Sequence, residues 1–305
     1  MRDSERVELM RETELRRNGD YWRGAFTAMG SPCEVLIEID SETTAQELLS
    51  TVAIETWRIE DKFSRYLPDN IVDQINSSGG ETISVDDETA NLLDFASALN
   101  ELSNARFDIT SGVLREAWVF DGGNRIPGKE QIAPILESVG WSKVRWQRPQ
   151  LTLQKGMQID FGGIGKEYAV DTAAEMLRIA TDSSCLINFG GDLVVTTPLE
   201  NSTGWQVGIE ALGNDVDKTE HLIRLQQGAL ATSGDARRFL LKDGVRYGHI
   251  LDPTTGWPVT DAPRSITVAA DTCTQAGMLA TLAMLKGPDA EQFLEQQQVQ
   301  FWCLR

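Results

Sequence analysis

Three glycines and two charged side chains stand close together at the centre of the chain, in residues 160–166. An alternating apolar run precedes them and a helical pattern follows, so we expect a strand, a glycine turn and the start of a helix. Glycine lets the backbone approach a ligand closely, and the amides at a helix N-terminus favour an anion. The stretch is therefore a candidate phosphate site, although an ordinary strand-to-helix turn has the same composition. Its Gly-Gly-x-Gly spacing matches neither a Walker loop nor a Rossmann fingerprint.

Four further polar clusters fall where strands or helices are expected to end, which is where a rigid fold can carry a site. They are Gly190-Gly191-Asp192, Thr232-Ser233-Gly234-Asp235, residues 249–256 and the helix that carries Thr281. Each cluster, taken singly, is more often a tight turn or a strand end than a binding site. The clusters indicate a binding site only when they are taken together.

His249 differs in kind from these clusters because the chain has only two histidines, the other being His221. A neutral imidazole at this position could accept a proton from an attacking hydroxyl group or bind a phosphate. A half-buried structural histidine fits the same pattern equally well. No Ser-His-Asp order, no H-E-x-x-H motif and no cysteine in a histidine-rich setting is present, so hydrolase and zinc sites have no support.

The elements that must position these residues can be read from the periodicity of the apolar side chains. Strands are expected at 33–39, 82–85, 151–159, 185–189, 193–197, 205–211, 221–225, 229–235, 265–270 and 299–303. Helices are expected at 44–63, 87–104, 129–139, 166–180, 273–286 and 288–297, and a hairpin at 239–251 turns at Asp243-Gly244. This order predicts an α+β fold with a mixed or antiparallel sheet and packed helices. We expect a charged leader at 1–20 and a single two-lobed domain at 21–305.

Composition limits the function further. The chain has 305 residues and a formal net charge of −18, which argues against binding to nucleic acid or to an anionic membrane. The four cysteines are scattered and suit reduced, buried thiols. No signal peptide or lipoprotein anchor is apparent, and no run approaches the roughly 20 apolar residues of a membrane helix, so a cytoplasmic protein is expected.

Taken in order, the polar clusters resemble the FAD:protein FMN transferase family, also called the ApbE flavin transferases. The motifs that carry the resemblance are residues 28–31, 63–66, 75–76, 107–110, 160–171, 188–192, 232–234, 249–256 and 280–281, together with Trp118. They cover nearly the whole chain after the leader. The resemblance implies an ApbE-like fold.

The resemblance also implies an activity. Such enzymes bind FAD, use Mg²⁺ to cleave its pyrophosphate, and transfer FMN to a threonine or serine of an acceptor protein. A pyrophosphate needs amide donors and a hard cation against its charge, which suits the clusters. The residues implied to bind FAD are Met29, Tyr66, Asp108, Lys166, Gly190, Gly191, Asp192, Ser233 and His249. His249 would contact the phosphate or act as the catalytic base on the acceptor hydroxyl.

The implied metal site departs from the family pattern. It would use the backbone carbonyl of Gly165 and the hydroxyl of Thr281, but the family's aspartate one helical turn before Thr281 is Gly277 here. Loss of that carboxylate predicts weak Mg²⁺ binding, which Asp271 could partly offset. Glu167, where the family commonly has glycine, is expected to add a negative charge beside the phosphate turn.

Because of Gly277, two alternatives stay open beside the FMN transferase. One is an FAD-binding protein that holds FAD without cleaving it. The other is an FAD pyrophosphatase, in which water takes the place of the acceptor hydroxyl.

Overall fold

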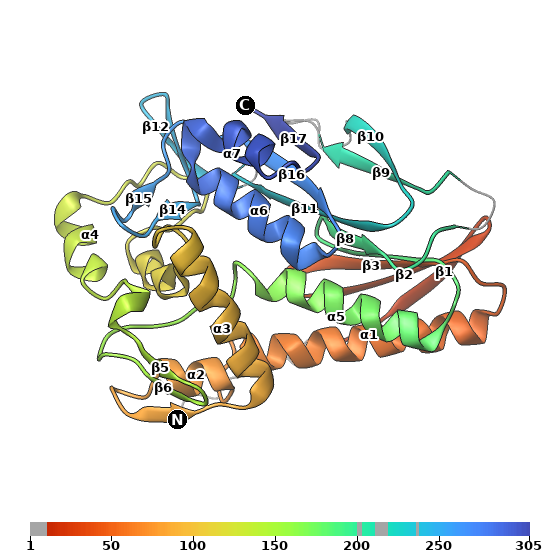
Figure 1. The fold of residues 1–305 in the computed structure, drawn as a ribbon, viewed down its shortest axis with the longest axis horizontal. Coiled ribbons are helices and arrows are strands. Elements are labelled where there is room, and N and C mark those ends of the chain that lie inside the picture. Colours follow the sequence, from red (N-terminus) through yellow and green to blue (C-terminus); the bar gives the residue numbers. More distant parts are fainter. Residues whose placement is uncertain (1–10, 200–202, 211–218, 236–237) are drawn as a thin grey trace.

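One antiparallel sheet organises the protein, of which a computed structural model describes residues 11–199, 203–210, 219–235 and 238–305. Its strand order is β1-β2-β3-β7-β8-β11-β16-β17, and each neighbouring pair is antiparallel. The strands are β1 (Glu14–Asn18), β2 (Tyr21–Ala28), β3 (Ser31–Ile37), β7 (Cys185–Phe189), β8 (Asp192–Val195), β11 (Gly228–Gly234), β16 (Ser265–Ala270) and β17 (Phe301–Leu304). This arrangement confirms the predicted α+β class (Figure 1).

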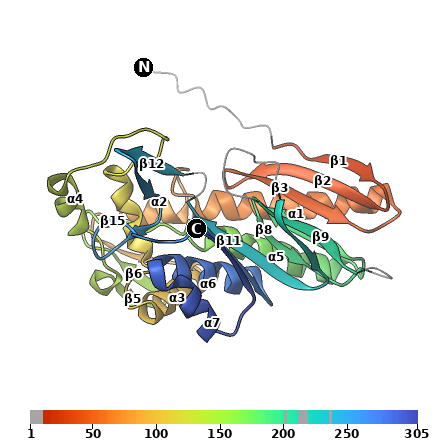
Figure 2. The same ribbon diagram turned by 90° about the horizontal axis from the view of Figure 1, so that it is seen from above.

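Three helices cover one face of this sheet. α1 (Glu42–Phe63) packs on β2, α5 (Gly165–Ala180) on β7 and β8, and α6 (Cys273–Leu285) on β11 and β16. α1 and α5 run side by side, and α5 also contacts α6 (Figures 1 and 2). The side chains between these helices and the sheet form the largest core. The start of α5 therefore has a fixed position relative to both neighbouring helices.

The remaining elements lie mostly beyond one end of the sheet, on the left in Figure 1. The helices there are α2 (Ile71–Asn76), α3 (Asp87–Leu102), η1 (Ile109–Glu116), α4 (Lys129–Leu136) and η2 (Trp141–Lys143), with η3 (Gly287–Asp289) and α7 (Ala290–Gln296) beside α6. The small sheets are β4 (Thr82–Ser84), β6 (Gln150–Thr152) and β5 (Arg145–Gln147), then β12 (Phe239–Lys242) with β13 (Val245–Gly248), and β14 (Leu251–Asp252) with β15 (Trp257–Pro258). A separate hairpin, β9 (Trp205–Glu210) with β10 (Thr219–Leu225), packs through Trp205 on Leu186 and Val195.

Several predicted boundaries shift. α1 begins at Glu42, two residues before the predicted start, because Ser41 caps it and accepts a hydrogen bond from the Thr44 amide. The strand predicted at 151–159 ends at Thr152, and an irregular segment then leads to the glycine turn. Residues 14–18, within the predicted leader, form the edge strand β1. The predicted strand 205–211 runs into residues 211–218, which lie outside the described part of the chain.

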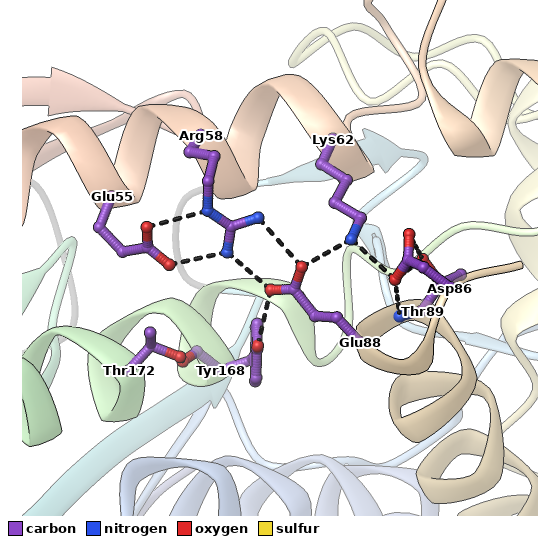
Figure 3. Close-up of polar contacts among 8 residues, drawn as sticks. All are labelled: Glu55, Arg58, Lys62, Asp86, Glu88, Thr89, Tyr168 and Thr172. Atoms are coloured by element: carbon purple, nitrogen blue, oxygen red, sulfur yellow. Dashed lines mark hydrogen bonds and ion pairs between the residues drawn. The ribbon is translucent and has the colours of Figure 1, made fainter.

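A cluster of charged side chains joins α1, α3 and α5 at the point where α5 begins (Figure 3). Glu88 at the centre accepts hydrogen bonds from Arg58, Lys62 and the hydroxyl of Tyr168, at 2.7 to 3.0 Å. Arg58 also pairs with Glu55. Burial alone would raise the pKa of Glu88, but the hydrogen bonds from these partners outweigh it and lower the pKa to about 2. Through Tyr168, this cluster fixes the first turns of α5.

We expect the Glu88→Gln variant to unfold with a free energy about 1–2 kcal/mol below that of the wild type, because charge-assisted bonds to two cations are lost. The stabilising carboxylate is fully charged above the ordinary pKa of 4.5 and becomes protonated as the pH falls toward about 2. The difference between the two proteins should therefore shrink below about pH 4.5. Urea unfolding at about pH 7 and about pH 3 measures it.

Asp87→Asn is the matched control for Glu88→Gln because Asp87 is the preceding residue and its side chain is 95% exposed. It should cost no more than about 0.5 kcal/mol. An equal loss in both variants would contradict a special role for Glu88.

Candidate functional site

The glycine turn at residues 160–166 is held by its own aspartate. Asp160 accepts a hydrogen bond from the Gly162 amide at 2.8 Å and pairs with Arg65 at 3.2 Å. Arg65 also donates to the carbonyl of Gly112 at 2.9 Å, which ties the turn to η1. The side chain of Asp160 is thus engaged within the protein. It shapes the turn, and α5 begins directly after it at Gly165.

Lys166 and Asp192 form an ion pair across the start of α5 and β8. The Lys166 Nζ atom lies 2.7 Å from Asp192 Oδ2, and the Asp192 side chain is only 3% exposed. The other carboxylate oxygen accepts the Thr232 amide of β11 at 3.0 Å. Burial alone would lower the pKa of Lys166, but the charge of Asp192, the hydrogen bond to it and the charge of Glu167 together outweigh burial and raise the pKa. Lys166 therefore stays protonated and presents a fixed positive charge.

Two strand turns lie beside this ion pair. Gly190 has a φ of +63°, and a Cβ atom there would stand 2.9 Å from Ser31 and 3.8 Å from Lys166 Nζ. Gly190 in the β7–β8 turn therefore lies close both to Lys166 and to Ser31, the residue at which β3 begins after the β2–β3 turn. The Met29 amide donates to Glu60 at 2.6 Å, which fixes that turn on α1. The structure thus brings together the predicted FAD-binding residues Lys166, Asp192, Gly190 and Gly191.

Glu167 lies in the space that a side chain at position 277 would fill. A Cβ atom on Gly277 would stand 2.6 Å from Glu167 Cγ and 2.7 Å from Glu167 Oε1. Glu167 Oε2 is buried and has no hydrogen-bond partner among the described residues. Burial, together with the charge of Asp192, raises the pKa of Glu167 to about 8.

The position of Glu167 corrects part of the sequence interpretation. A carboxylate does stand beside Gly277 on α6, but it comes from α5. Asp271, the residue considered for a partial offset of Gly277, is exposed and lines a different recess with Arg178 and Gln227. Gly165 and Thr281 lie on the contacting helices α5 and α6, one turn or less from Glu167 and Gly277 along their helices.

His249 directly follows strand β13. Its Nδ1 lies 3.2 Å from the carbonyl oxygen of Arg238. A carbonyl oxygen can only accept, so Nδ1 carries the proton and the neutral ring keeps its lone pair on Nε2. Burial lowers the pKa of His249, which favours this neutral form. The ring also packs edge-on against Phe120. His249 therefore has the protonation state that a general base requires.

Three other predicted FAD-binding residues, Tyr66, Asp108 and Ser233, differ in exposure and in hydrogen-bond partners. Tyr66 is 74% exposed and accepts a hydrogen bond from Arg115. Asp108 is 6% exposed, and its oxygens accept the amides of Thr110 and Trp141 at 2.8 and 2.7 Å, so it braces η1. Ser233 is half-buried on β11 and neighbours Thr232, whose amide binds Asp192. Of the three, Ser233 is tied most directly to the ion pair.

Arg115 is a residue that sequence reasoning missed. Besides its bond to Tyr66, it lies 3.9 Å from Asp160 in the glycine turn, and its charge contributes to the lowered pKa of His249. It therefore carries positive charge between residues that are far apart in the sequence. Its position near the end of η1, seven residues after Asp108, was the only available signal.

Among the described residues, no group of three or more histidine, cysteine, aspartate or glutamate side chains could hold a metal ion. None of the described helices is long and apolar enough to cross a membrane. A cation near Glu167 would thus depend on backbone, hydroxyl or ligand oxygens in addition to a carboxylate.

Comparison with known proteins places these features in a wider context. A family model described as the ApbE family matches residues 29–303. A relative from Vibrio cholerae, named FAD:protein FMN transferase, is 28% identical over 236 residues, which are 76% of this chain and 71% of the relative. A relative of the same name from Escherichia coli (strain K12) is 25% identical over 282 residues, covering 89% of this chain and 77% of the relative.

Solved structures of similar proteins match nearly the whole chain. The crystal structure of the ApbE protein from Thermotoga maritima has a TM-score of 0.82 and 30% identity, covering 93% of this chain and 94% of that one. The flavin transferase ApbE from Vibrio cholerae has a TM-score of 0.77 and 25% identity, covering 96% and 93%. The likeness therefore extends over nearly the whole chain.

Proposed function

This chain belongs to the ApbE family, and on that premise we propose that it is an FAD:protein FMN transferase. The observation that carries the proposal is the ion pair between Lys166 and the buried Asp192, set among glycine turns at the start of α5. The turns offer amide donors to a pyrophosphate, and Lys166 offers it a fixed positive charge. A protein with a formal net charge of −18 needs such a local positive site to bind an anionic dinucleotide.

The reaction that we propose is a displacement at the phosphorus atom of the FMN half of FAD. The hydroxyl oxygen of an acceptor threonine or serine forms a bond to this phosphorus, and the bond to the AMP oxygen breaks. His249 Nε2 takes the hydroxyl proton, since Nδ1 is held by the Arg238 carbonyl. Lys166 holds the phosphate charge, while Met29, Tyr66, Asp108 and Ser233 are the further residues that we propose for FAD binding.

We also propose Mg²⁺ as the cofactor. The orphaned carboxylate oxygen of Glu167, the Gly165 carbonyl and the Thr281 hydroxyl are the hard oxygen donors that this ion prefers, so the residues fit it. When bound, Mg²⁺ would neutralise the pyrophosphate and stabilise the charge on the departing AMP. The acceptor protein is the remaining partner that the reaction requires.

The proposal is tested with the purified chain, FAD, Mg²⁺ and the acceptor protein of the Vibrio cholerae relative. We expect the intact mass of the acceptor to increase by one FMN. Replacing the acceptor hydroxyl residue by alanine should abolish the gain, which controls for non-covalent flavin.

Two other outcomes would contradict transfer. Release of AMP and free FMN with no change in the acceptor mass would indicate an FAD pyrophosphatase. Tight binding of FAD with neither product would indicate a binding protein. FAD would bind at the same site in both cases, so the products, and not the affinity, decide between them.

A further inference from the structure

The carboxylate of Glu167 is the feature that the ion pair and the hydrogen bonds of the site leave unexplained. Its Oε2 atom is buried and has no partner among the described residues. An isolated carboxylate of this kind is costly to bury unless a proton, a cation or several donors compensate its charge. The fold nevertheless holds the side chain between α5 and α6, next to the proposed phosphate site.

Gly277 creates the room for this side chain. Any larger residue at position 277 would place its Cβ within 2.6 to 3.0 Å of Glu167 Cγ, Oε1 and Cδ. Gly277 lies inside α6, where a glycine costs about 1 kcal/mol relative to alanine. A glycine here is therefore matched to the glutamate on the neighbouring helix.

The other acidic side chains nearby already have partners. Asp192 binds Lys166 and the Thr232 amide. Asp171 accepts the amides of Cys273 and Thr274, each at 2.8 Å, and so caps the start of α6. Of these three acids, only Glu167 has a buried oxygen that can bind a further group.

Neutral oxygen ligands stand on the same two helices. Thr281 lies one turn after Gly277 on α6, on the face that meets Glu167. The backbone of Gly165 lies two residues before Glu167, at the first position of α5. A carboxylate, a hydroxyl and a carbonyl form a donor set for a hard divalent cation, with the remaining positions open to phosphate and water.

We propose that Glu167 supplies the anionic ligand of the Mg²⁺ site, in place of a carboxylate from position 277. The proposal rests on the proposed function, because the cation would bridge to the FAD pyrophosphate. It reverses the expectation that Gly277 weakens the metal site. In this assignment the carboxylate comes from α5, and Gly277 on α6 leaves the room that it needs.

The test measures binding of Mn²⁺, which suits the same oxygen ligands, through the loss of the EPR signal of the free ion. Titrations contain FAD and are corrected with an FAD blank. We expect Glu167→Gln, which keeps the size of the side chain but not its charge, to weaken Mn²⁺ binding at least about tenfold. Glu175→Gln is the matched control, because Glu175 is an exposed acid on the same helix. It should leave the affinity within about twofold.

A double variant keeps the test decisive if the single one loses stability. Glu167→Gly/Gly277→Asp returns the carboxylate to α6 and should bind Mn²⁺ within about threefold of the wild type. Wild-type affinity in Glu167→Gln, or no recovery in a folded double variant, would overturn the assignment.

The result is separable from the proposed function. FMN transfer by the wild type together with full Mn²⁺ affinity in Glu167→Gln would refute the ligand and leave the function standing. Mn²⁺ binding that depends on Glu167 in a protein that transfers no FMN would refute the function and leave the ligand standing.

Discussion

A His249→Gln variant is expected to transfer FMN about 10²–10⁴ times more slowly than the wild type, since that is the usual contribution of a positioned general base. Glutamine can still donate a hydrogen bond to the Arg238 carbonyl but cannot take a proton from the acceptor hydroxyl. FAD affinity should stay within about threefold, because Lys166 and the glycine turns hold the phosphates. Single-turnover transfer rates and FAD titration measure the two quantities.

The second histidine provides the control for this variant. His221 is exposed on β10, so His221→Gln should leave the transfer rate unchanged. Because burial lowers the pKa of His249 below its ordinary 6.5, the base is already deprotonated at neutral pH. The wild-type rate should therefore be flat near pH 7 and fall only as the pH drops below about 6.5. A large loss of FAD affinity in His249→Gln would instead identify a phosphate contact.

A Lys166→Met variant should lose both stability and FAD binding. It leaves the Asp192 carboxylate, 3% exposed, without its cation, which costs about 3 kcal/mol in the free energy of unfolding. FAD affinity should fall about 10- to 100-fold, since a charge-assisted hydrogen bond to phosphate is lost. Urea unfolding and flavin fluorescence titration measure the two effects.

A double variant separates the two roles of Lys166. In Lys166→Met/Asp192→Asn the buried charge is gone, while the amide oxygen can still accept the Thr232 amide. We expect most of the stability to return and the FAD affinity to stay low. Lys155→Met, at an exposed lysine before the turn, controls for the loss of one positive charge. Recovery of FAD binding in the double variant would show that Lys166 serves only the fold.

Local sequence signals predicted the elements that depend on local physics. The hairpin at 239–251 turns at Asp243-Gly244, where both residues have positive φ as such turns require. The helix predicted at 166–180 begins one residue earlier, at Gly165. In these cases the turn residues and the apolar period determine the structure without help from distant contacts.

The errors occurred where packing overrides local pattern. The alternating residues 151–159 predict one strand, yet β6 ends at Thr152 and a turn follows at residues 155–156. Further along, the backbone of Ile159 bonds to the side chain of Asn76, at 2.7 and 3.1 Å, instead of to a neighbouring strand. Likewise, β1 is charged and exposed, so only its pairing with β2 identifies it as a strand. The periodicity of apolar residues gives no information about such long-range partners.

The candidate site likewise has features that local sequence predicts and features that depend on long-range contacts. The clusters around Lys166, Gly190 and Asp192 were found from the sequence, since glycine turns and charged residues mark them. The relation between Glu167 and Gly277 was not found, because each residue was weighed singly against a family pattern. Only the contact of α5 with α6 shows that the glutamate fills the space of the missing side chain.

The most direct test of FMN transfer is the ratio of AMP released to FMN attached to the acceptor. It is measured in parallel reactions with and without the acceptor protein. The account predicts one AMP for each FMN on the acceptor, and almost no AMP when the acceptor or its hydroxyl residue is missing. AMP that accumulates at the same rate without the acceptor, or in excess of the attached FMN, would contradict it.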